Sequence, residues 1–482
     1  MDILKNLQPT AVFAHFEKIC SIPHGSFNEK ALSDYITQWA KGLGLETVQD
    51  ELWNVIIKKP GTKGRENDEA MIIQAHTDMV CEKNMDVDFD FETQGLDIYV
   101  DGDWIKARGT TLGGDNGIAV AMAMAILEDN TLEHPPLEVV LTTVEEAGMD
   151  GAFALDASIL KGTRLLNVDN SDEGVFLTGC AGGANVKINL PIIKQDLPGG
   201  DFAAFTIFVG GLKGGHSGMD INTERANSNK LLARALRGLK TPFYLVDIAG
   251  GSKDNAIPRE AWAKVLVKPA DGGTMAREIA ELDAILKAEL STPDPDVFVR
   301  LDGKPFSSTQ VFLDETTKNL IGLLTAIPSG IAHMSIDFPG LVEASSNMGV
   351  VRIEDNKVVI TNSVRSSVES RKNEICERIE YIAASFGAEG KASDGYPGWA
   401  YSPVSKLRET FKRIYFEKYG KEATILAIHA GLECGIFASK IDGLDMISFG
   451  PDMFDLHTPD ERVSIASVER CYDFLKDVLK NL

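Results

Sequence analysis

Cysteine is scarce in this chain of 482 residues, which contains only six, and none of them form a Cys-x-x-Cys pair. Such scattered thiols predict neither a disulfide framework nor a thiolate zinc site. No run of 18 apolar residues occurs, so the sequence predicts no transmembrane helix. The first residues lack a basic segment followed by an apolar core, so no signal peptide is expected. Together these absences predict a reduced, cytoplasmic protein.

Basic residues are outnumbered, with 48 Lys and Arg against 71 Asp and Glu and a net charge of −23. Nucleic acids and anionic membrane surfaces attract basic patches, so neither is expected as a partner. The glycine-rich turns at 112–116 and 210–218 fit no nucleotide-binding fingerprint. No Gly-x-Ser-x-Gly nucleophile elbow occurs either.

Apolar strands alternate with amphipathic helices in the first part of the chain, which predicts an α/β domain with a mainly parallel sheet. Helices are predicted at 9–20, 28–43 and 402–419, and strands end near His76, residue 144 and Asp169. After about residue 183 the pattern becomes a mixture of strands and helices, including a predicted strand at 350–361. This change predicts an inserted α+β domain that serves as a lid or dimerisation domain. The predicted division is 1–185 and 392–482 for the catalytic domain and 186–391 for the insertion.

Side chains able to bind a metal follow several predicted strands or occupy the turns beside them. His76 and Asp78 lie two apart after an apolar strand, so they project from one face of an extended chain. The other candidates occupy four further stretches: Asp115 in a glycine-rich turn, the pair Glu145 and Glu146, Asp169, and His457. Ligand sites of open parallel sheets lie beyond the carboxyl ends of the strands, so these positions can converge.

Two histidines and three carboxylates supply the ligands for two metals that share one bridging carboxylate. Nitrogen and oxygen ligands of this kind suit zinc. Each acid taken alone is more often a solvated turn residue or a helix cap than a ligand, and Asp115 could simply cap the helix that follows it.

The motifs His76-Thr-Asp78, Gly114-Asp115-Asn-Gly, Glu145-Glu146-Ala-Gly, Asp169 and His457-Thr-Pro-Asp-Glu461 occur in that order. This set resembles the di-zinc metallopeptidase family of aminopeptidases, aminoacylases, carboxypeptidases and carnosinases. The stretches 107–113, 145–153, 179–183, 211–218 and 255–261 resemble its bacterial dipeptidase branch. The resemblance spans nearly the whole chain. It implies a catalytic α/β domain with an inserted lid, a homodimer, and hydrolysis of Xaa-His and related, carnosine-like dipeptides.

The resemblance also implies roles for the metal-site residues. His76 and Asp169 would bind one zinc, Glu146 and His457 the other, and Asp115 both; manganese or cobalt could replace zinc. Asp78 would orient His76. Glu145 would be the general base that takes a proton from a zinc-activated water and passes it to the leaving amine.

Residues outside this set are implied to contact the substrate. His216, in the glycine-rich stretch 211–218 of the insertion, would donate a hydrogen bond to the developing oxyanion, in its own subunit or in the neighbouring one. Arg365 would bind the C-terminal carboxylate of the substrate. Asn255, His429 and Glu433 would make further contacts with the substrate.

Two alternative functions remain open at this point. One is a deacylase or carboxypeptidase that acts on N-acyl amino acids. The other is a non-catalytic binding protein with the same fold, which the presence of Glu145 and all five proposed ligands speaks against.

Overall fold

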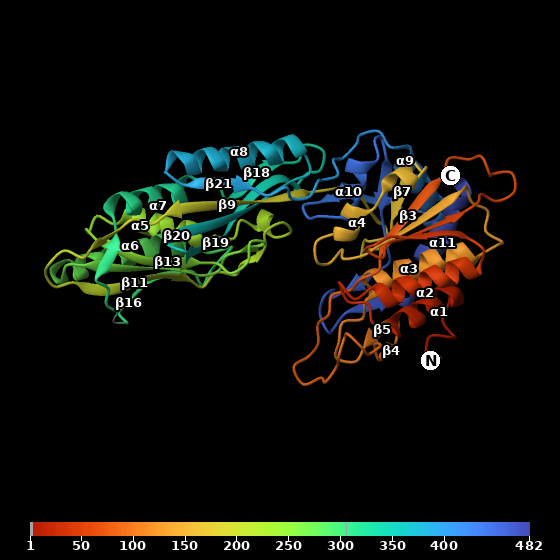
Figure 1. Ribbon diagram of the computed structural model, residues 1–482, viewed down its shortest axis with the longest axis horizontal. Coiled ribbons are helices and arrows are strands. Elements are labelled where there is room, and N and C mark those ends of the chain that lie inside the picture. Colours follow the sequence, from red (N-terminus) through yellow and green to blue (C-terminus); the bar gives the residue numbers. More distant parts are fainter. Residues whose placement is uncertain (1–2, 305) are drawn as a thin grey trace. The chain divides into compact units, whose positions relative to one another are not determined.

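The computed structural model describes residues 3–304 and 306–482 and divides into two compact units (Figure 1). The first unit runs to Gly179 and also includes Tyr401–Ala427 and Glu433–Leu482. The second unit comprises Cys180–Ala400 and Ile428–Leu432. Its bounds differ from the predicted insertion at 186–391, and it includes a second, five-residue segment that the sequence pattern did not indicate.

The first unit is built on an eight-stranded sheet with the order β1-β2-β6-β3-β7-β23-β8-β22. Its central strands β6, β3, β7 and β23 run parallel, whereas β1, β2 and β8 pair antiparallel with their neighbours. Both β3 and β6 are buried along their whole length, as expected of parallel strands covered on both faces. The strands are β1 (Glu46–Gln49), β2 (Val55–Lys59), β3 (Met71–His76), β6 (Leu137–Thr142), β7 (Arg164–Asn167), β8 (Val175–Cys180), β22 (Thr424–Ile428) and β23 (Asp445–Ser448).

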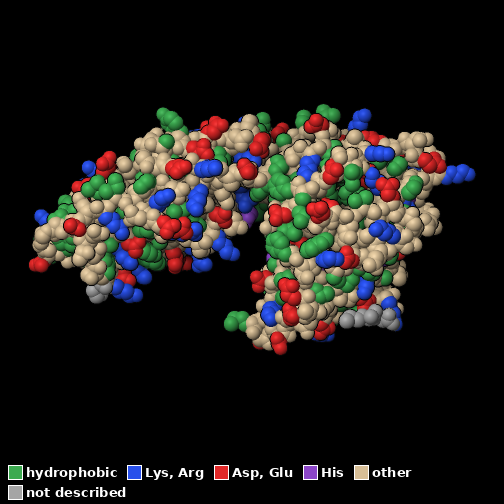
Figure 2. Space-filling model, in the orientation of Figure 1, with side chains coloured by type: hydrophobic (Ala, Val, Ile, Leu, Met, Phe, Trp, Pro, Cys, Tyr) green, Lys and Arg blue, Asp and Glu red, His purple; other side chains and the backbone are tan. Residues whose placement is uncertain are grey.

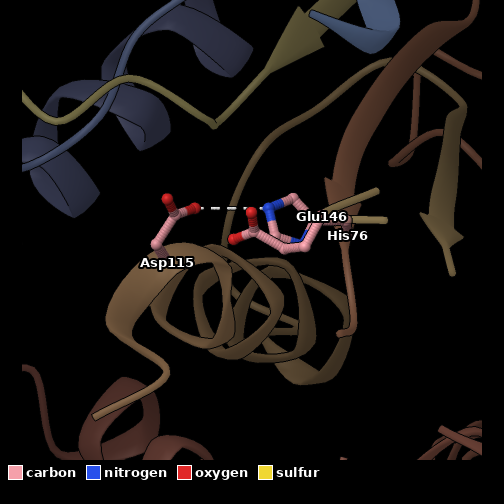
Figure 3. A group of neighbouring side chains, drawn as sticks. All are labelled: His76, Asp115 and Glu146. Carbon is pink, nitrogen blue, oxygen red and sulfur yellow. Dashed lines mark hydrogen bonds and ion pairs between the residues drawn. The ribbon is translucent and has the colours of Figure 1, made fainter. Parts of the chain in front are cut away.

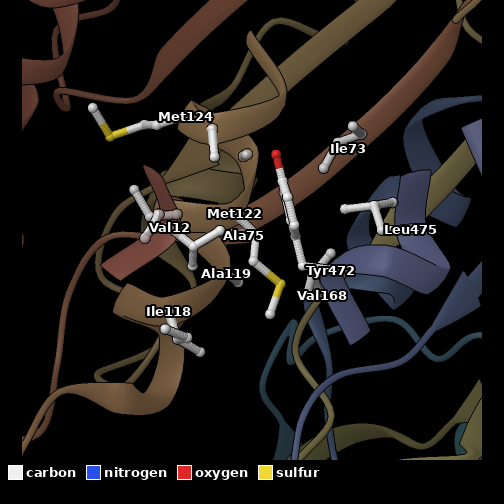
Figure 4. Close-up of a cluster of buried hydrophobic side chains, with 14 of the residues drawn as sticks. Val12, Ile73, Ala75, Ile118, Ala119, Met122, Met124, Val168, Tyr472 and Leu475 are labelled. Atoms are coloured by element: carbon white, nitrogen blue, oxygen red, sulfur yellow. The ribbon is translucent and has the colours of Figure 1, made fainter. Parts of the chain in front are cut away.

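The helices of the first unit pack against this sheet and against one another. The helices are α1 (Thr10–Cys20), α2 (Lys30–Gly42), α3 (Gly114–Glu128), α4 (Asp150–Ala154), α9 (Lys406–Tyr419), α10 (Glu433–Lys440) and α11 (Ile465–Asn481). Figure 4 shows side chains of α1, β3, α3 and α11 meeting in one cluster, with Met122 and Tyr472 among them. Met122 is fully buried, so α3 is a core helix, and its first turn carries Asp115.

A small sheet of the first unit has the order β24-β25-β5-β4. Its strands are β4 (Ile98–Asp101), β5 (Trp104–Ala107), β24 (Met453–Phe454) and β25 (Arg462–Ser464). Because β25 pairs with β5, the loop between β24 and β25, which contains His457, is fixed at both ends.

The second unit contains an antiparallel sheet with the order β16-β11-β15-β13-β19-β20-β9-β21, and β18 pairs with β19. Figure 1 shows α8 lying along one face of this sheet. The strands are β9 (Gly182–Pro191), β11 (Ala203–Gly210), β13 (Tyr244–Gly250), β15 (Ala261–Val267), β16 (Phe298–Asp302), β18 (Gly330–Met334), β19 (Val342–Glu354), β20 (Lys357–Ser366) and β21 (Glu389–Ala392). The helices are α5 (Ser228–Gly238), α6 (Gly272–Glu289), α7 (Asp314–Ala326) and α8 (Glu369–Ser385), and short strands β10 (Lys194–Asp196), β12 (Gly215–His216), β14 (Ala256–Ile257) and β17 (Gln310–Phe312) complete the unit.

The prediction of one strand at 350–361 is wrong, because a tight hairpin turn divides it into β19 and β20. Asp355 and Asn356 form the turn with φ of 45° and 59°. Two-residue hairpin turns of this kind need positive φ at both positions, which Asp and Asn tolerate better than other non-glycine residues.

Acidic side chains are interspersed with lysines and arginines over the visible faces of both units (Figure 2). Among the described residues, no helix is long and apolar enough to span a membrane.

Candidate functional site

The five predicted metal ligands all lie in the first unit, at one edge of its sheet. His76 is the last residue of β3, Glu146 follows β6, and Asp169 follows β7. Asp115 lies in the first turn of α3, and His457 lies in the loop between β24 and β25. Parallel strands bring their carboxyl ends to the same edge, which explains why His76, Glu146 and Asp169 converge.

The side chains form two groups that meet at Asp115. The Nε2 atom of His76 lies 3.2 Å from Oδ1 of Asp115 and 3.5 Å from Oδ1 of Asp169. The Nε2 atom of His457 lies 3.6 Å from Oδ2 of Asp115 and 3.0 Å from Oε1 of Glu146. Figure 3 shows His76, Asp115 and Glu146, whose ligand atoms lie within 4.8 Å of one another. Each oxygen of Asp115 thus faces a different histidine.

The chemistry and spacing of this set fit divalent ions. Imidazole nitrogens and carboxylate oxygens bind zinc at about 2 Å, so neighbouring ligand atoms in a tetrahedral site lie about 3.3 Å apart. The observed separations of 3.0 to 3.6 Å are of this size. Hydrogen bonds to Asp115 and Glu146 raise the pKa of His457 to about 10, which reflects a strongly negative site that a cation would neutralise.

Asp78 contacts both the histidine and the acid pair. Nδ1 of His76 lies 3.0 Å from the backbone carbonyl of Asp78 and 3.4 Å from its Oδ1. The carboxylate also accepts hydrogen bonds from the backbone N–H of Glu145 at 2.9 Å and of Glu146 at 3.1 Å. The Ser26 hydroxyl donates to the same carboxylate at 2.8 Å. Asp78 therefore orients His76 and also fixes the backbone of the two glutamates.

The turn after β6 directs Glu145 and Glu146 toward the site. Val144 has a φ of 57°, which is uncommon for a β-branched residue. Its N–H donates to the buried carboxylate of Glu29 at 2.9 Å, which holds this conformation. Burial raises the pKa of Glu145 well above its ordinary value, and the charges of Asp169 and Glu433 raise it further. A carboxyl group with a raised pKa is a stronger base for proton transfer near neutral pH.

Asn116 contributes to the site although the sequence analysis assigned it no role. Its Oδ1 accepts from the backbone N–H of His76 at 3.3 Å, and its Nδ2 donates to Oδ1 of Asp169 at 2.9 Å. The Nδ2 atom also donates to the carbonyl of Val168 at 2.7 Å. Its position directly after Asp115 was the available signal, and an amide can donate and accept at once.

Three of the predicted substrate residues, His216, Arg365 and His429, gather within the second unit. A Cβ atom added to Gly218 would lie 2.3 Å from the carbonyl oxygen of His429, 3.1 Å from Cε1 of His216 and 3.3 Å from Cδ of Arg365. All three residues therefore approach each other around this glycine, where no side chain fits.

The hydrogen bonds of this cluster define its chemistry. Nδ1 of His216 accepts from the backbone N–H of Met219 at 3.0 Å, which places the proton of the neutral ring on Nε2. His429 Nε2 contacts the Ser345 hydroxyl at 2.7 Å, and Arg365 donates to the Tyr396 hydroxyl at 2.7 Å. Burial and the charge of Arg365 lower the pKa of both histidines, to about 3 for His429. Both rings are therefore neutral at physiological pH.

Two polar atoms of the cluster are buried without a hydrogen-bond partner: Nε of Arg365 and Nδ1 of His429. The side chain of Arg365 belongs to a residue that is only 8% exposed. Among the described residues, no acidic side chain forms an ion pair with Arg365. A buried guanidinium of this kind is a ready partner for an anion.

The remaining predicted substrate residues lie in different surroundings. Asn255 is exposed in the second unit, and its carbonyl accepts from the N–H of Ser217, next to His216. Glu433 belongs to the first unit and has no exposed surface. It accepts hydrogen bonds from Gln74 at 2.5 Å and Thr142 at 2.7 Å. Burial raises the pKa of Glu433 to about 8. Its contact with a substrate stays a prediction.

A pocket of about 540 Å³ in the first unit borders Glu146, one of the predicted metal ligands. Its wall includes an aromatic pair, Phe89 and Phe91, whose ring centroids lie 4.8 Å apart. Asp90 and Glu92 also line it. Lys83 lines it as well. The pocket thus combines an apolar wall with more acidic than basic side chains beside the proposed metal site.

Known proteins have similar sequences and the same fold. The chain is 41% identical to the cytosol non-specific dipeptidase of Escherichia coli over an alignment 488 residues long, which covers 100% of this chain and 99% of the relative. The crystal structure of an aminoacylhistidine dipeptidase from Vibrio alginolyticus superposes with a TM-score of 0.92 at 40% identity, covering 99% of this chain and 98% of that one. The aminopeptidase PepT of Bacillus cereus, at 14% identity and a TM-score of 0.57 with 98% of each chain covered, shares the fold alone. Residues 72–481, which include every ligand candidate, match the sequence profile of the Peptidase family M20/M25/M40. Full-length identity above 40% and this profile match show that the chain belongs to that peptidase family.

Proposed function

We propose that this peptidase is a metal-dependent dipeptidase that hydrolyses Xaa-His and related dipeptides with two divalent ions, zinc by preference or manganese or cobalt. One observation carries the proposal: the two oxygens of Asp115 face two separate histidine–carboxylate groups. A carboxylate shared in this way is what a bridged two-metal site requires. The names of the two dipeptidase relatives support the choice of substrate class.

Glu145 is the proposed general base. Divalent ions, when bound, would lower the pKa of a water and polarise the scissile carbonyl. The carboxylate of Glu145 takes a proton from the attacking water and later passes it to the leaving amine nitrogen. Its backbone is fixed by Asp78, so the carboxylate is held in place during both transfers.

His216 and Arg365 are proposed to bind the two negative charges of the reacting substrate. His216 carries its proton on Nε2 and is neutral, so Nε2–H can donate to the developing oxyanion. Arg365 has an unpartnered Nε and is buried, so it favours a terminal carboxylate. We propose that Asn255, His429 and Glu433 make further contacts with the substrate. In this proposal the second unit is a lid and dimerisation domain, and His216 acts in its own or in the neighbouring subunit of a homodimer.

The pocket beside Glu146 favours a dipeptidase over an N-acyl deacylase. It offers room for the residue that precedes the scissile bond. Asp90 and Glu92 outnumber Lys83, the lysine that also lines the pocket, and carry charge opposite to that of a free α-ammonium group, whereas an N-acyl group has no positive charge. A cytoplasmic location accords with the name of the cytosol dipeptidase relative.

The experiment that tests the proposal combines a substrate panel with metal analysis of the same preparation. The panel contains Xaa-His dipeptides, other dipeptides, and N-acetyl amino acids. The proposal expects hydrolysis of free dipeptides, two divalent ions per chain, and loss of activity on chelation. Preferential hydrolysis of N-acetyl amino acids, or full activity in metal-free protein, would contradict it.

A further inference from the structure

Glu461 is a buried acid that none of the proposed catalytic steps uses. Its side chain is 3% exposed, and no Lys, Arg or His pairs with it among the residues that the structure describes. A buried carboxylate without a cation needs hydrogen-bond donors from elsewhere. Glu461 finds them entirely in the main chain.

Four consecutive backbone N–H groups donate to this carboxylate. The N–H groups of Leu112 and Gly113 donate to Oε2 at 2.7 and 3.2 Å. Those of Gly114 and Asp115 donate to Oε1 at 2.8 and 3.3 Å. The turn can present them together because Gly113 has a φ of 66°. The last of the four belongs to the proposed bridging residue.

Glu461 also belongs to the loop that carries the other histidine. Its own N–H donates to the carbonyl of Thr458 at 3.1 Å, one residue after His457. Arg462, the next residue, begins β25, which pairs with β5. The carboxylate therefore links a loop anchored in one sheet to a turn 346 residues away in the sequence.

We infer that Glu461 is a positioning residue of the metal centre, which holds Asp115 and His457 at the separation required to bind one ion between them. This inference rests on the proposed two-metal site. A purely structural explanation is that Glu461 caps α3, because Gly113 at its N-terminus supplies no capping side chain. The two explanations differ in a measurable way: a cap alters stability, whereas a positioning residue alters metal affinity.

Glu138 provides a matched control in the same unit. It is also 3% exposed, and its Oε2 accepts from the backbone N–H of Lys161 at 2.8 Å and of Gly162 at 2.9 Å. The segment that it holds contains none of the proposed ligands. Unlike Glu461, Glu138 also has a cation nearby, because its Oε1 lies 3.6 Å from Nζ of Lys58. Glu138→Gln therefore removes a buried carboxylate that holds main-chain N–H groups, and weakens this ion pair, without touching the site.

The test compares the wild type with Glu461→Gln, Glu461→Asp and Glu138→Gln. Zn²⁺ affinity is measured by titration in competition with a chromophoric chelator, and stability is measured by thermal unfolding without metal. In Glu461→Gln the four N–H groups meet an amide, which has only one acceptor oxygen. The affinity for Zn²⁺ should therefore fall by about 10- to 100-fold in one of the two binding steps, as is typical when a group that orients ligands is lost. Glu461→Asp keeps the charge but is shorter, and its affinity should be intermediate. Glu138→Gln should lower the unfolding temperature and leave Zn²⁺ affinity unchanged.

Wild-type Zn²⁺ affinity in both folded Glu461 variants would overturn the inference, and so would an equal loss of affinity in Glu138→Gln. Should Glu461→Gln fail to fold, Glu461→Asp alone decides between the two explanations. If the wild-type protein itself binds no Zn²⁺, Mn²⁺ or Co²⁺, the proposed function fails first, and that failure is distinguishable from a failure of the role given to Glu461.

Discussion

The carboxylate of Asp78 accepts a hydrogen bond from the backbone N–H of Glu145 at 2.9 Å. The proposed base is thus held by the residue that also contacts the ring of His76. One acid thus positions the last residue of β3 and the turn that follows the neighbouring strand β6.

Asp78→Asn should lower kcat by about 10- to 100-fold with little loss of metal, as expected for a group that orients others. The Asp78 backbone carbonyl would still hold His76, but an asparagine amide cannot accept all three hydrogen bonds that reach the carboxylate. Steady-state kinetics and metal analysis measure the two effects. Ser26→Ala, which removes one of the three bonds, is the control and should have the smaller effect. Unchanged kcat in Asp78→Asn would show that the hydrogen bonds from the N–H groups of the two glutamates do not contribute to catalysis.

Glu145→Gln should keep both metals and lose turnover by about 10²- to 10⁴-fold, the usual contribution of a positioned acid–base group. Glu146→Gln should instead lose metal, because Glu146 contacts His457 at 3.0 Å. Single-turnover rates and metal content distinguish the two variants. The opposite pattern would reverse the roles of the adjacent acids.

Asp115→Ala should reduce the content of both metals, because each oxygen of Asp115 faces a different histidine. His457→Ala should weaken the binding of mainly one metal, because His457 belongs to only one of the two histidine–carboxylate groups. Elemental analysis after dialysis measures both. Asp460→Ala removes an exposed carboxylate from the same loop as His457 and serves as the control. Full metal content in Asp115→Ala would refute the bridged site.

The fold of the first unit and its ligand candidates could be predicted because each depends on local sequence. Strand ends followed by acids and histidines are visible in the sequence, and parallel strands place such ends together. Asn116 and Glu461, to which we give a positioning role, were assigned no role from the sequence, because their partners lie far away in the sequence, as the 346-residue separation of Glu461 and Asp115 shows. The burial of Glu433 was missed for a related reason: a glutamate usually favours water, and only the tertiary structure supplies Gln74 and Thr142 as partners.

His216→Ala should lower kcat strongly while both metals remain bound, because the residue belongs to the second unit and to none of the ligand groups. Mixing inactive His216→Ala chains with inactive Glu145→Gln chains tests whether the site is shared. If His216 acts across a homodimer, mixed dimers contain one site with both residues intact, and activity partly returns. No recovery despite verified subunit exchange would mean that His216 acts within its own chain or not at all.

Arg365→Lys should raise KM for dipeptides with a free carboxylate by about 10-fold or more, because lysine cannot reproduce the two-pronged geometry of a guanidinium. The same substitution should change the hydrolysis of the corresponding dipeptide amides little, since these substrates lack the carboxylate. A larger rise in KM for the dipeptides than for their amides would indicate recognition of the carboxylate, whereas equal changes would indicate that the substitution disturbs the surrounding side chains.

Tyr396→Phe serves as the control for Arg365, because it removes only the hydroxyl that accepts from Arg365 at 2.7 Å. The guanidinium and its charge remain, so the preference for free carboxylates should persist with a smaller rise in KM. If Arg365→Lys raised KM equally for dipeptides with a free carboxylate and for dipeptide amides, Arg365 would not be a carboxylate-binding residue. Arg365 would then be a buried structural cation of the second unit, and the group that recognises the carboxylate would have to be sought elsewhere.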